Sequence, residues 1–420
     1  MLGGRIIGEG VDGCVFSEPM WPCASGASGM PNSKDPRYVS KLVPLKDEES
    51  EFLKSAARLL GPERSKYLAG LHGECAPANS FNPPKSKEKD VFKTGLKSVQ
   101  SWQKRGQACE GLKDILKSGN PISKDHKIMF ISRYPMSVSS WIETLQKTQQ
   151  PYSVIMKQVE RAIPTFLDVL QQLVQGQSEQ LIHIDLHTGN IFVKEPLEFG
   201  IADFGHCVFR RYSDVSTHVS FYSTFLVGYI AKYSFYSGEY SQVPLEARLL
   251  NFCYKKSMES VSPAQLVKAW ESDYEVRQFS AGSKDVVSVH KGVMLDYLLK
   301  KPLFIAMIET IQAISRKVKA TLEPVALVHS LRQNEKDVLD YILSRYTVIS
   351  PVNTITEDIM NIYQNQPMIT KKGIGSSSLI RFIIQAILAP YDQDGSSLVE
   401  SVKSVGMADM RILWSDVVKV

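Results

Sequence analysis

The first 45 residues alternate short apolar runs with turns rich in glycine and proline, which is the pattern of short β-strands. The runs RIIGEGV and CVFSEPM flank a glycine cluster, and YVSKLVPL follows a Gly-, Pro- and Ser-rich loop at 21–36. Three strands joined in this way predict an antiparallel meander. The next stretch, KDEESEFLKSAARLLG, begins acidic, has apolar residues at helical spacing and stops at Gly61-Pro62, so it predicts a helix.

After residue 134 the pattern changes from strands to helices. KIMFISRYP predicts a last buried strand, and the two stretches that follow it have helical periodicity. Two short strands, NIFVK and FGIAD, interrupt the helical part, and beyond residue 206 we expect only helices and loops. The predicted fold class is α+β and bilobal, with a small β-rich lobe at 1–134 and a large, mainly helical lobe at 135–420. The Pro- and Lys-rich stretch 76–98 predicts an exposed insertion.

Composition and charge narrow the possible partners. A net charge of +5 over 420 residues is mild and favours a solvated surface, so we expect no nucleic-acid partner. The most apolar runs are shorter than a bilayer span and contain charges, and the N-terminus lacks a signal-peptide core, so we expect no membrane association and a cytoplasmic location. The six cysteines show no CxxC pair and no zinc spacing, which predicts free thiols in a reducing compartment.

The stretch GEGVDGCV at 8–15 has the pattern G-x-G-x-x-G-x-V. A dinucleotide-binding fold would place a helix directly after the glycines, whereas strand-like residues lie on both sides here. A glycine-rich hairpin tip can fold over phosphates, because bare Cα atoms let backbone N–H groups approach oxygen closely. We therefore predict that a nucleotide contacts Gly8, Glu9, Gly10, Gly13 and Val15.

Lys41 lies on the third predicted strand. A buried lysine on a strand needs an acidic partner or a bound anion. The acidic start of the next helix offers three candidates: Glu48, Glu49 and Glu51. We favour Glu51, because small and apolar residues follow it at helical spacing. The alternative for each is a solvated acid at a helix N-terminus, which the helix dipole favours.

A second set of polar residues lies in HIDLHTGNIFVKEPLEFGIADFG at 183–205. Asp185, Asn190 and Asp203 carry oxygen donors suited to Mg²⁺ and to an attacking hydroxyl. A hairpin of NIFVK and FGIAD would return Asp203 to the side of the other two. Asp185 would accept the proton of the hydroxyl, Asn190 and Asp203 would hold the metal, and Lys41 would neutralise phosphate charge. The predicted chemistry is phosphoryl transfer.

These motifs, in this order, resemble the protein-kinase superfamily over roughly residues 3–210. The matching residues are the glycine loop, Val39-Ser40-Lys41, His183, Asp185, Leu186 and Asn190, and Asp203-Phe204-Gly205, which begins 18 residues after Asp185. The resemblance implies a bilobal fold, ATP and Mg²⁺ as cofactors, a Ser/Thr protein substrate, and an adenine-binding hinge at 132–134 that includes Arg133. In its overall divergence the chain is similar to kinases carried by large DNA viruses.

The chain departs from the family at two places in the catalytic loop. Ile184 replaces the arginine that usually receives an activation-loop phosphate, so we expect no regulation by that route. His187 replaces a lysine and is predicted to be catalytic. The resulting HxDLHxxN is similar to small-molecule kinases of the aminoglycoside and choline kinase type, which are one alternative to a protein kinase. A catalytically silent pseudokinase is the other.

The region after the catalytic motifs matches the family poorly. VPLE at 243–246 is a late and imperfect match to the usual Ala-Pro-Glu, which makes 206–280 an enlarged activation and substrate segment. The stretch 284–304 resembles the helix whose aspartate braces the catalytic loop, and Asp285 would be that residue.

Overall fold

The protein has an α+β fold that divides into two compact units, which we describe separately. Unit 1 contains Met1–Pro135 and Ala202–Gly205, and unit 2 contains Met136–Ile201 and His206–Val420. A computed structural model describes the residues 6–10, 13–17, 23–24, 29–32, 34–78, 124–237, 240, 243–277, 295, 298–363 and 389–391. The predicted insertion, from residue 79 onward, and Asp285 lie outside these residues.

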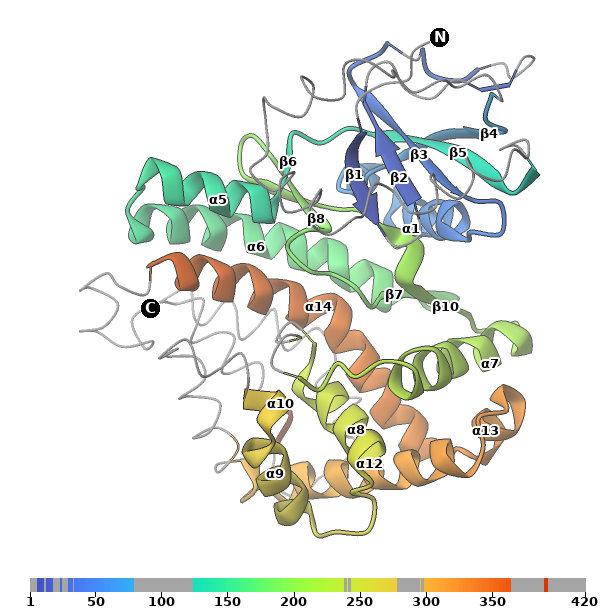
Figure 1. The fold of residues 1–420 in the computed structure, drawn as a ribbon, viewed down its shortest axis with the longest axis vertical. Coiled ribbons are helices and arrows are strands. Elements are labelled where there is room, and N and C mark those ends of the chain that lie inside the picture. The colour runs from blue at the N-terminus through green and yellow to red at the C-terminus, as the bar shows by residue number, and fades with distance from the viewer. Residues whose placement is uncertain are drawn as a thin grey trace. The chain divides into compact units, whose positions relative to one another are not determined.

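Unit 1 is built on a five-stranded antiparallel sheet in the order β1-β2-β3-β5-β4 (Figure 1). Its strands are β1 Ile6–Gly10, β2 Gly13–Phe16, β3 Tyr38–Pro44, β4 Leu71–Cys75 and β5 His126–Ser132. The antiparallel pairing of β1 with β2 and of β2 with β3 confirms the predicted meander. Buried side chains from β2, β3 and β5 form the core of this sheet: Cys14, Phe16, Leu42, Ile128 and Phe130.

One described helix, α1 Glu49–Ser65, follows β3. Its buried positions include Glu49, Leu53, Ala56 and Leu60, spaced by four, three and four residues, so they form one side of the helix. At Gly61 the backbone leaves the helical region with φ 67° and ψ 176°, immediately before a proline. Gly61-Pro62, which was predicted to end the helix, therefore interrupts it, and a short helical stretch follows the interruption.

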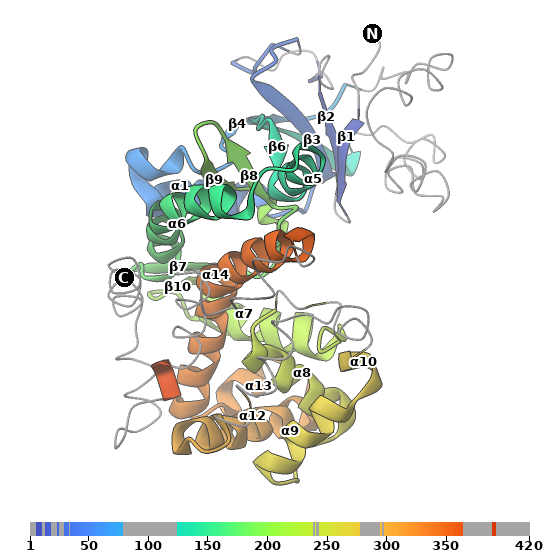
Figure 2. The same ribbon diagram turned by 90° about the vertical axis from the view of Figure 1, so that its left-hand side faces the viewer.

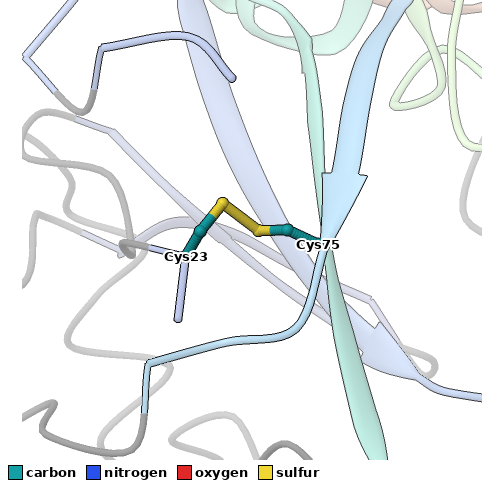
Figure 3. The surroundings of a disulfide bond; sticks show 2 residues. All are labelled: Cys23 and Cys75. Carbon is teal, nitrogen blue, oxygen red and sulfur yellow. A yellow bond between two sulfur atoms is a disulfide. The ribbon is translucent and has the colours of Figure 1, made fainter. Parts of the chain in front are cut away.

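A disulfide joins Cys23 to Cys75, the last residue of β4 (Figure 3). The two Cα atoms lie 5.8 Å apart although 52 residues separate the cysteines. Cys14 is disulfide-bonded as well. The prediction of free thiols is wrong for these three, because a pairing over so long a span leaves no local spacing signature. Cys207 and Cys253 of unit 2 form no disulfide and are buried.

Unit 2 is mainly helical and carries two small antiparallel sheets, β6-β8-β9 and β7-β10. Its helices are α5 Val138–Thr148, α6 Tyr152–Val174, α7 Val215–Ser223, α8 Leu245–Lys256, α9 Pro263–Ser272, α10 Tyr274–Arg277, α12 Pro302–Ala320, α13 Pro324–Ser330 and α14 Gln333–Tyr363. Its strands are β6 Met136–Ser137, β7 Glu179–His183, β8 Ile191–Lys194, β9 Glu198–Ile201 and β10 Cys207–Arg211.

The strands of unit 2 confirm one prediction and correct another. The hairpin of NIFVK and FGIAD is the antiparallel pair β8–β9. The expectation of no strand beyond residue 206 is wrong, because β10 pairs with β7 along its whole length. Five residues that include two arginines carry no strand signature, and the pairing itself makes this segment a strand.

The longest helix of unit 2 is α14, with 31 residues. It lies beside α6 and α5 (Figure 1 and Figure 2) and also contacts β7 and α12. Side chains along its length are fully buried, among them Ile342, Thr347 and Ile355. Over the described residues, no helix combines the length and apolar character needed to cross a membrane.

Candidate active site

Lys41 lies at the centre of the unit 1 sheet, where β3 is flanked by β2 and β5. Its side chain is only 6% exposed. The ammonium Nζ lies 2.6 Å from Glu49 Oε2 and 2.7 Å from Asp203 Oδ1, and it donates a hydrogen bond to each. The carboxylates of Glu49 and Asp203, which lie 154 residues apart in the sequence, thus both bind the ammonium of Lys41.

The acidic partner of Lys41 on α1 is Glu49, and the prediction of Glu51 is wrong. Glu49 is the first residue of the helix, and its side chain is 1% exposed. Glu51 lies two residues further, about 200° around the helix axis, so it faces the opposite side. Its side chain is 67% exposed and pairs with Lys54 instead. The side of the helix that is buried therefore differs by about half a turn from the side that the apolar spacing indicated.

The electrostatics of this cluster favour a charged lysine. Burial alone would lower the pKa of Lys41, but the carboxylates of Glu49 and Asp203 outweigh it and raise that pKa above its ordinary value. With all three groups ionised, one positive and two negative charges leave a formal charge of −1. Asp203 is 34% exposed, so this negative excess lies at a partly exposed carboxylate, where a cation would balance it.

The segment Ala202–Gly205 packs within unit 1. Phe204 is fully buried, which anchors the segment. Asp203 has φ 57°, in the left-handed region that residues other than glycine adopt at a cost of about 1–3 kcal/mol. Aspartate tolerates this region better than most residues. The backbone is held in an uncommon conformation at the residue whose carboxylate reaches Lys41, which is typical of functional sites.

The predicted glycine loop is the β1–β2 hairpin. Gly10 pairs with Gly13 at its end, and Val15 pairs with Lys41 on the neighbouring strand. Gly8, Glu9 and Gly10 belong to β1, with an irregularity in register between Ile6 and Gly8. The hairpin thus ends in glycines and runs next to the strand that carries Lys41, as a phosphate-covering loop requires.

The predicted hinge residue Arg133 follows β5. Its backbone N–H donates to the carbonyl of Arg37 at 2.8 Å, and its side chain is exposed. The neighbouring Tyr134 is buried and donates from its hydroxyl to the carbonyl of Leu68 at 2.7 Å. The chain is therefore fixed here by its own backbone contacts, and the predicted adenine contact of Arg133 stays a prediction.

The second set of predicted residues lies in unit 2, in the turn between β7 and β8. The amide nitrogen of Asn190 donates to the backbone carbonyl of Asp185 at 2.9 Å and approaches its carboxylate at 3.4 Å. The backbone N–H of His187 donates to the same carbonyl at 3.1 Å. Asp185 is held from its own turn, and its side chain is 42% exposed. An exposed, backbone-anchored carboxylate can accept a proton from an incoming hydroxyl.

His187 is turned toward Asp185. Its Nδ1 accepts the N–H of Gly189 at 3.0 Å, which leaves Nε2 to carry the ring proton. That Nε2 lies 3.7 Å from Asp185 Oδ2. A Cβ atom on Gly189 would lie 2.6 Å from Cε1 of the ring, so only glycine permits this packing. The predicted catalytic role of His187 stays a prediction, and its geometry places it against the proposed base.

The predicted metal ligands are Asp203 in unit 1 and Asn190 in unit 2. Among the described residues, no group of three or more His, Cys, Asp or Glu side chains could hold a metal ion. Magnesium needs no such group, because it is commonly bound by one or two protein carboxylates together with substrate phosphates. Asn190 uses its amide nitrogen within the turn, so its oxygen is the atom suited to a cation. The donor types fit Mg²⁺.

A residue that the sequence did not mark as functional lies just after these motifs. Arg210 of β10 is 4% exposed, and its guanidinium bonds to Tyr222, Asp340, Gln180 and Tyr212. The aromatic residues that follow this arginine in the sequence are the signal that could have drawn attention to Arg210. Another missed contact is the buried ion pair of Glu246, in the VPLE stretch, with Arg345 at 3.3 Å.

Comparison with known proteins gives no family for this chain. No protein-family model matches it, and no curated protein matches it.

Proposed function

We propose that this chain is an ATP-dependent phosphotransferase, and that it transfers the γ-phosphate to a serine or threonine hydroxyl of a protein. The observation that carries the proposal is the buried Lys41, bonded to Glu49 and to Asp203. A lysine bound this tightly on a central strand is a fixed point charge, which suits a phosphate ligand. Its two carboxylates leave a negative excess that suits a divalent cation.

In unit 1 the proposal gives each residue of the cluster one task. Lys41 neutralises charge on the α- and β-phosphates, and Glu49 holds its ammonium in place. Asp203 would hold Mg²⁺, and the glycine hairpin would cover the phosphates. The metal, when bound, neutralises charge that develops on the phosphates during transfer. Because the site is preorganised by buried ion pairs, little reorganisation is needed during the reaction.

In unit 2 the proposal makes Asp185 the acceptor of the hydroxyl proton. The carboxylate is 42% exposed, so an acceptor hydroxyl can reach it, while the bond from Asn190 fixes the turn that carries it. The geometric requirement is a heavy-atom distance of about 2.6–3.2 Å between base and hydroxyl, which a mobile carboxylate meets poorly. The turn therefore supplies the orientation that proton transfer needs.

One observation favours a second acceptor class. His187 approaches Asp185, and it is the residue by which the loop is similar to small-molecule kinases. A small alcohol of the choline or aminoglycoside type is therefore the alternative acceptor. The acceptor class is decided by offering ATP with casein or myelin basic protein, and separately with such small alcohols.

The test of the proposal separates nucleotide binding from chemistry. Asp203→Ala should weaken Mg²⁺-dependent ATP binding and abolish turnover, because it removes a metal ligand. Asp185→Asn should leave ATP affinity nearly unchanged while turnover falls about 10²- to 10⁴-fold, the usual contribution of a general base. The measurements are calorimetric ATP titration and phosphate transfer. Asp35→Asn is the control, since Asp35 pairs with Arg37.

Two outcomes would contradict the proposal. A parent protein that binds ATP but transfers phosphate to no acceptor, not even itself, would be a pseudokinase. Full activity of Asp185→Asn would mean that another group accepts the proton, whatever the acceptor class.

A further inference from the structure

Three polar side chains of α14 contact three different segments of unit 2. They are Asp340, Thr347 and Asp358, separated by 7 and 11 residues. At 3.6 residues per turn these separations are close to two and three full turns, so the three side chains lie on one side of the helix. We refer to them as the polar stripe of α14.

The middle residue of the stripe contacts the start of the catalytic turn. The hydroxyl oxygen of Thr347 accepts the backbone N–H of His183 at 3.0 Å. Both residues are fully buried. His183 ends β7 and precedes Asp185 by two residues. A buried N–H must find an acceptor, and here α14 supplies the acceptor directly before the proposed base.

The last residue of the stripe contacts the far side of the same turn. The carboxylate of Asp358 accepts the hydroxyl of Thr188 at 2.7 Å. Thr188 lies between Asp185 and Asn190, is 6% exposed, and also receives a hydrogen bond from the hydroxyl of Ser139 at 2.9 Å. Thr188 is thus fixed between α14 and the first turn of α5.

The first residue of the stripe extends the attachment to the partner strand of β7. Asp340 accepts hydrogen bonds from Arg210 at 3.2–3.3 Å. Arg210 lies opposite Gln180 in the β7–β10 pair, and Cys207 lies opposite His183. The two-stranded sheet and the turn that leaves it are therefore attached to one helix at three levels.

We propose that α14 is the scaffold of the catalytic turn, and that Thr347 and Asp358 are positioning residues for Asp185. The inference rests on the proposed function, since it takes Asp185 of this turn to be the base. The two contacts lie on either side of Asp185, so they limit its movement from both directions. A misplacement of a catalytic group by about 1 Å can cost about 100-fold in rate, so this attachment is directly relevant to turnover.

The test compares matched threonines of the same helix. Thr347→Val keeps the shape and removes the acceptor for His183, whereas Thr356→Val removes a hydroxyl that bonds only to the carbonyl of Val352 within α14. Both threonines are buried. We expect turnover of Thr347→Val to fall about 10- to 100-fold with unchanged ATP affinity, and that of Thr356→Val to change less than about twofold. Thr347→Ser should restore turnover, and Asp358→Leu should behave as Thr347→Val.

A second measurement does not depend on activity. Hydrogen exchange of the segment 183–190, followed by mass spectrometry, should become about tenfold faster in Thr347→Val and unchanged in Thr356→Val. Equal exchange and equal turnover in the two valine variants would overturn the scaffold. If exchange is faster in Thr347→Val but the parent protein transfers no phosphate, the scaffold role of α14 is supported and the proposed phosphotransferase function is refuted. Loss of exchange protection throughout unit 2 would show that Thr347 supports the fold in general, which would also overturn the inference.

Discussion

Lys41 of unit 1 and Arg210 of unit 2 are both buried cations, and their side chains are bound in different ways. Lys41 of unit 1 has two carboxylate partners, Glu49 and Asp203. Arg210 of unit 2 has one carboxylate partner, Asp340, and otherwise bonds to neutral side chains and lies against the rings of Phe221 and Tyr212. The first group has a formal charge of −1, and the second is balanced.

Under the proposed function, the first cation belongs to a binding site and the second is a structural anchor. A compact ammonium with an excess of negative charge around it can accept further ions of either sign, since a phosphate and a divalent metal balance each other. A planar guanidinium whose two amino groups are already bonded and whose face is stacked has no comparable capacity. Burial alone therefore does not distinguish the two cations, whereas the charge around them does.

The largest expected effect is the loss of turnover in Lys41→Met. Removing a preorganised charge from a phosphate site should lower turnover about 10³-fold, because no other group of the unit 1 cluster is positive. The control is Lys127→Met on the neighbouring strand β5. Lys127 is 15% exposed and bonds to Ser50 and Glu74, so it matches Lys41 in setting but not in role. Equal losses of turnover in the two variants would show that Lys41 has no special role in phosphate transfer.

A smaller effect, on stability, is expected for Arg210→Met. The variant leaves Asp340 without its cation, and loss of these charged hydrogen bonds, in a pair whose carboxylate is 32% exposed, should lower the free energy of unfolding by about 2 kcal/mol. Arg211→Met is the control, because Arg211 is 46% exposed and its pair with Glu179 should contribute less than about 1 kcal/mol. Urea unfolding of both variants measures the difference. A loss below about 1 kcal/mol in Arg210→Met would mean that the anchor is dispensable.

The smallest effect is expected from phosphatase treatment, which should leave turnover within about twofold of the untreated protein. An ordering phosphate needs an arginine partner. Ile184 is apolar, and Arg210 is already bonded to Asp340 and Gln180. The measurement is turnover before and after dephosphorylation, with phosphate content followed by mass. A collapse that is reversed on rephosphorylation would point to the exposed Arg211 as a phosphate receptor.

The sequence predicted those features that depend on local pattern. The antiparallel meander and the β8–β9 hairpin follow from alternating apolar residues and turn residues. Lys41 and Asp203 were each singled out by a short motif, and the structure joins them in an ion pair, while their predicted roles stay predictions. The acidic partner on α1 was not predicted, since shifting the assumed phase of a helix by half a turn exchanges Glu49 for Glu51.

The remaining features depend on contacts between distant residues. Thr347 and Asp358 lie 164 and 170 residues from the positions they contact, and no periodicity connects a threonine on a helix to a strand end so far away. β10 is a strand only because β7 lies next to it. Asp285, proposed as a brace from sequence, lies outside the described residues, so its role stays a prediction.

The disulfide between Cys23 and Cys75 means that unit 1 is oxidised after its synthesis. Each closure removes two electrons and two protons from the thiols and passes them to an acceptor outside the chain. Newly synthesised protein and mature protein therefore differ in a covalent bond as well as in their folding. A reduced sample and an oxidised sample of this sequence are two different compounds, whose kinetic constants are comparable only at a defined redox potential.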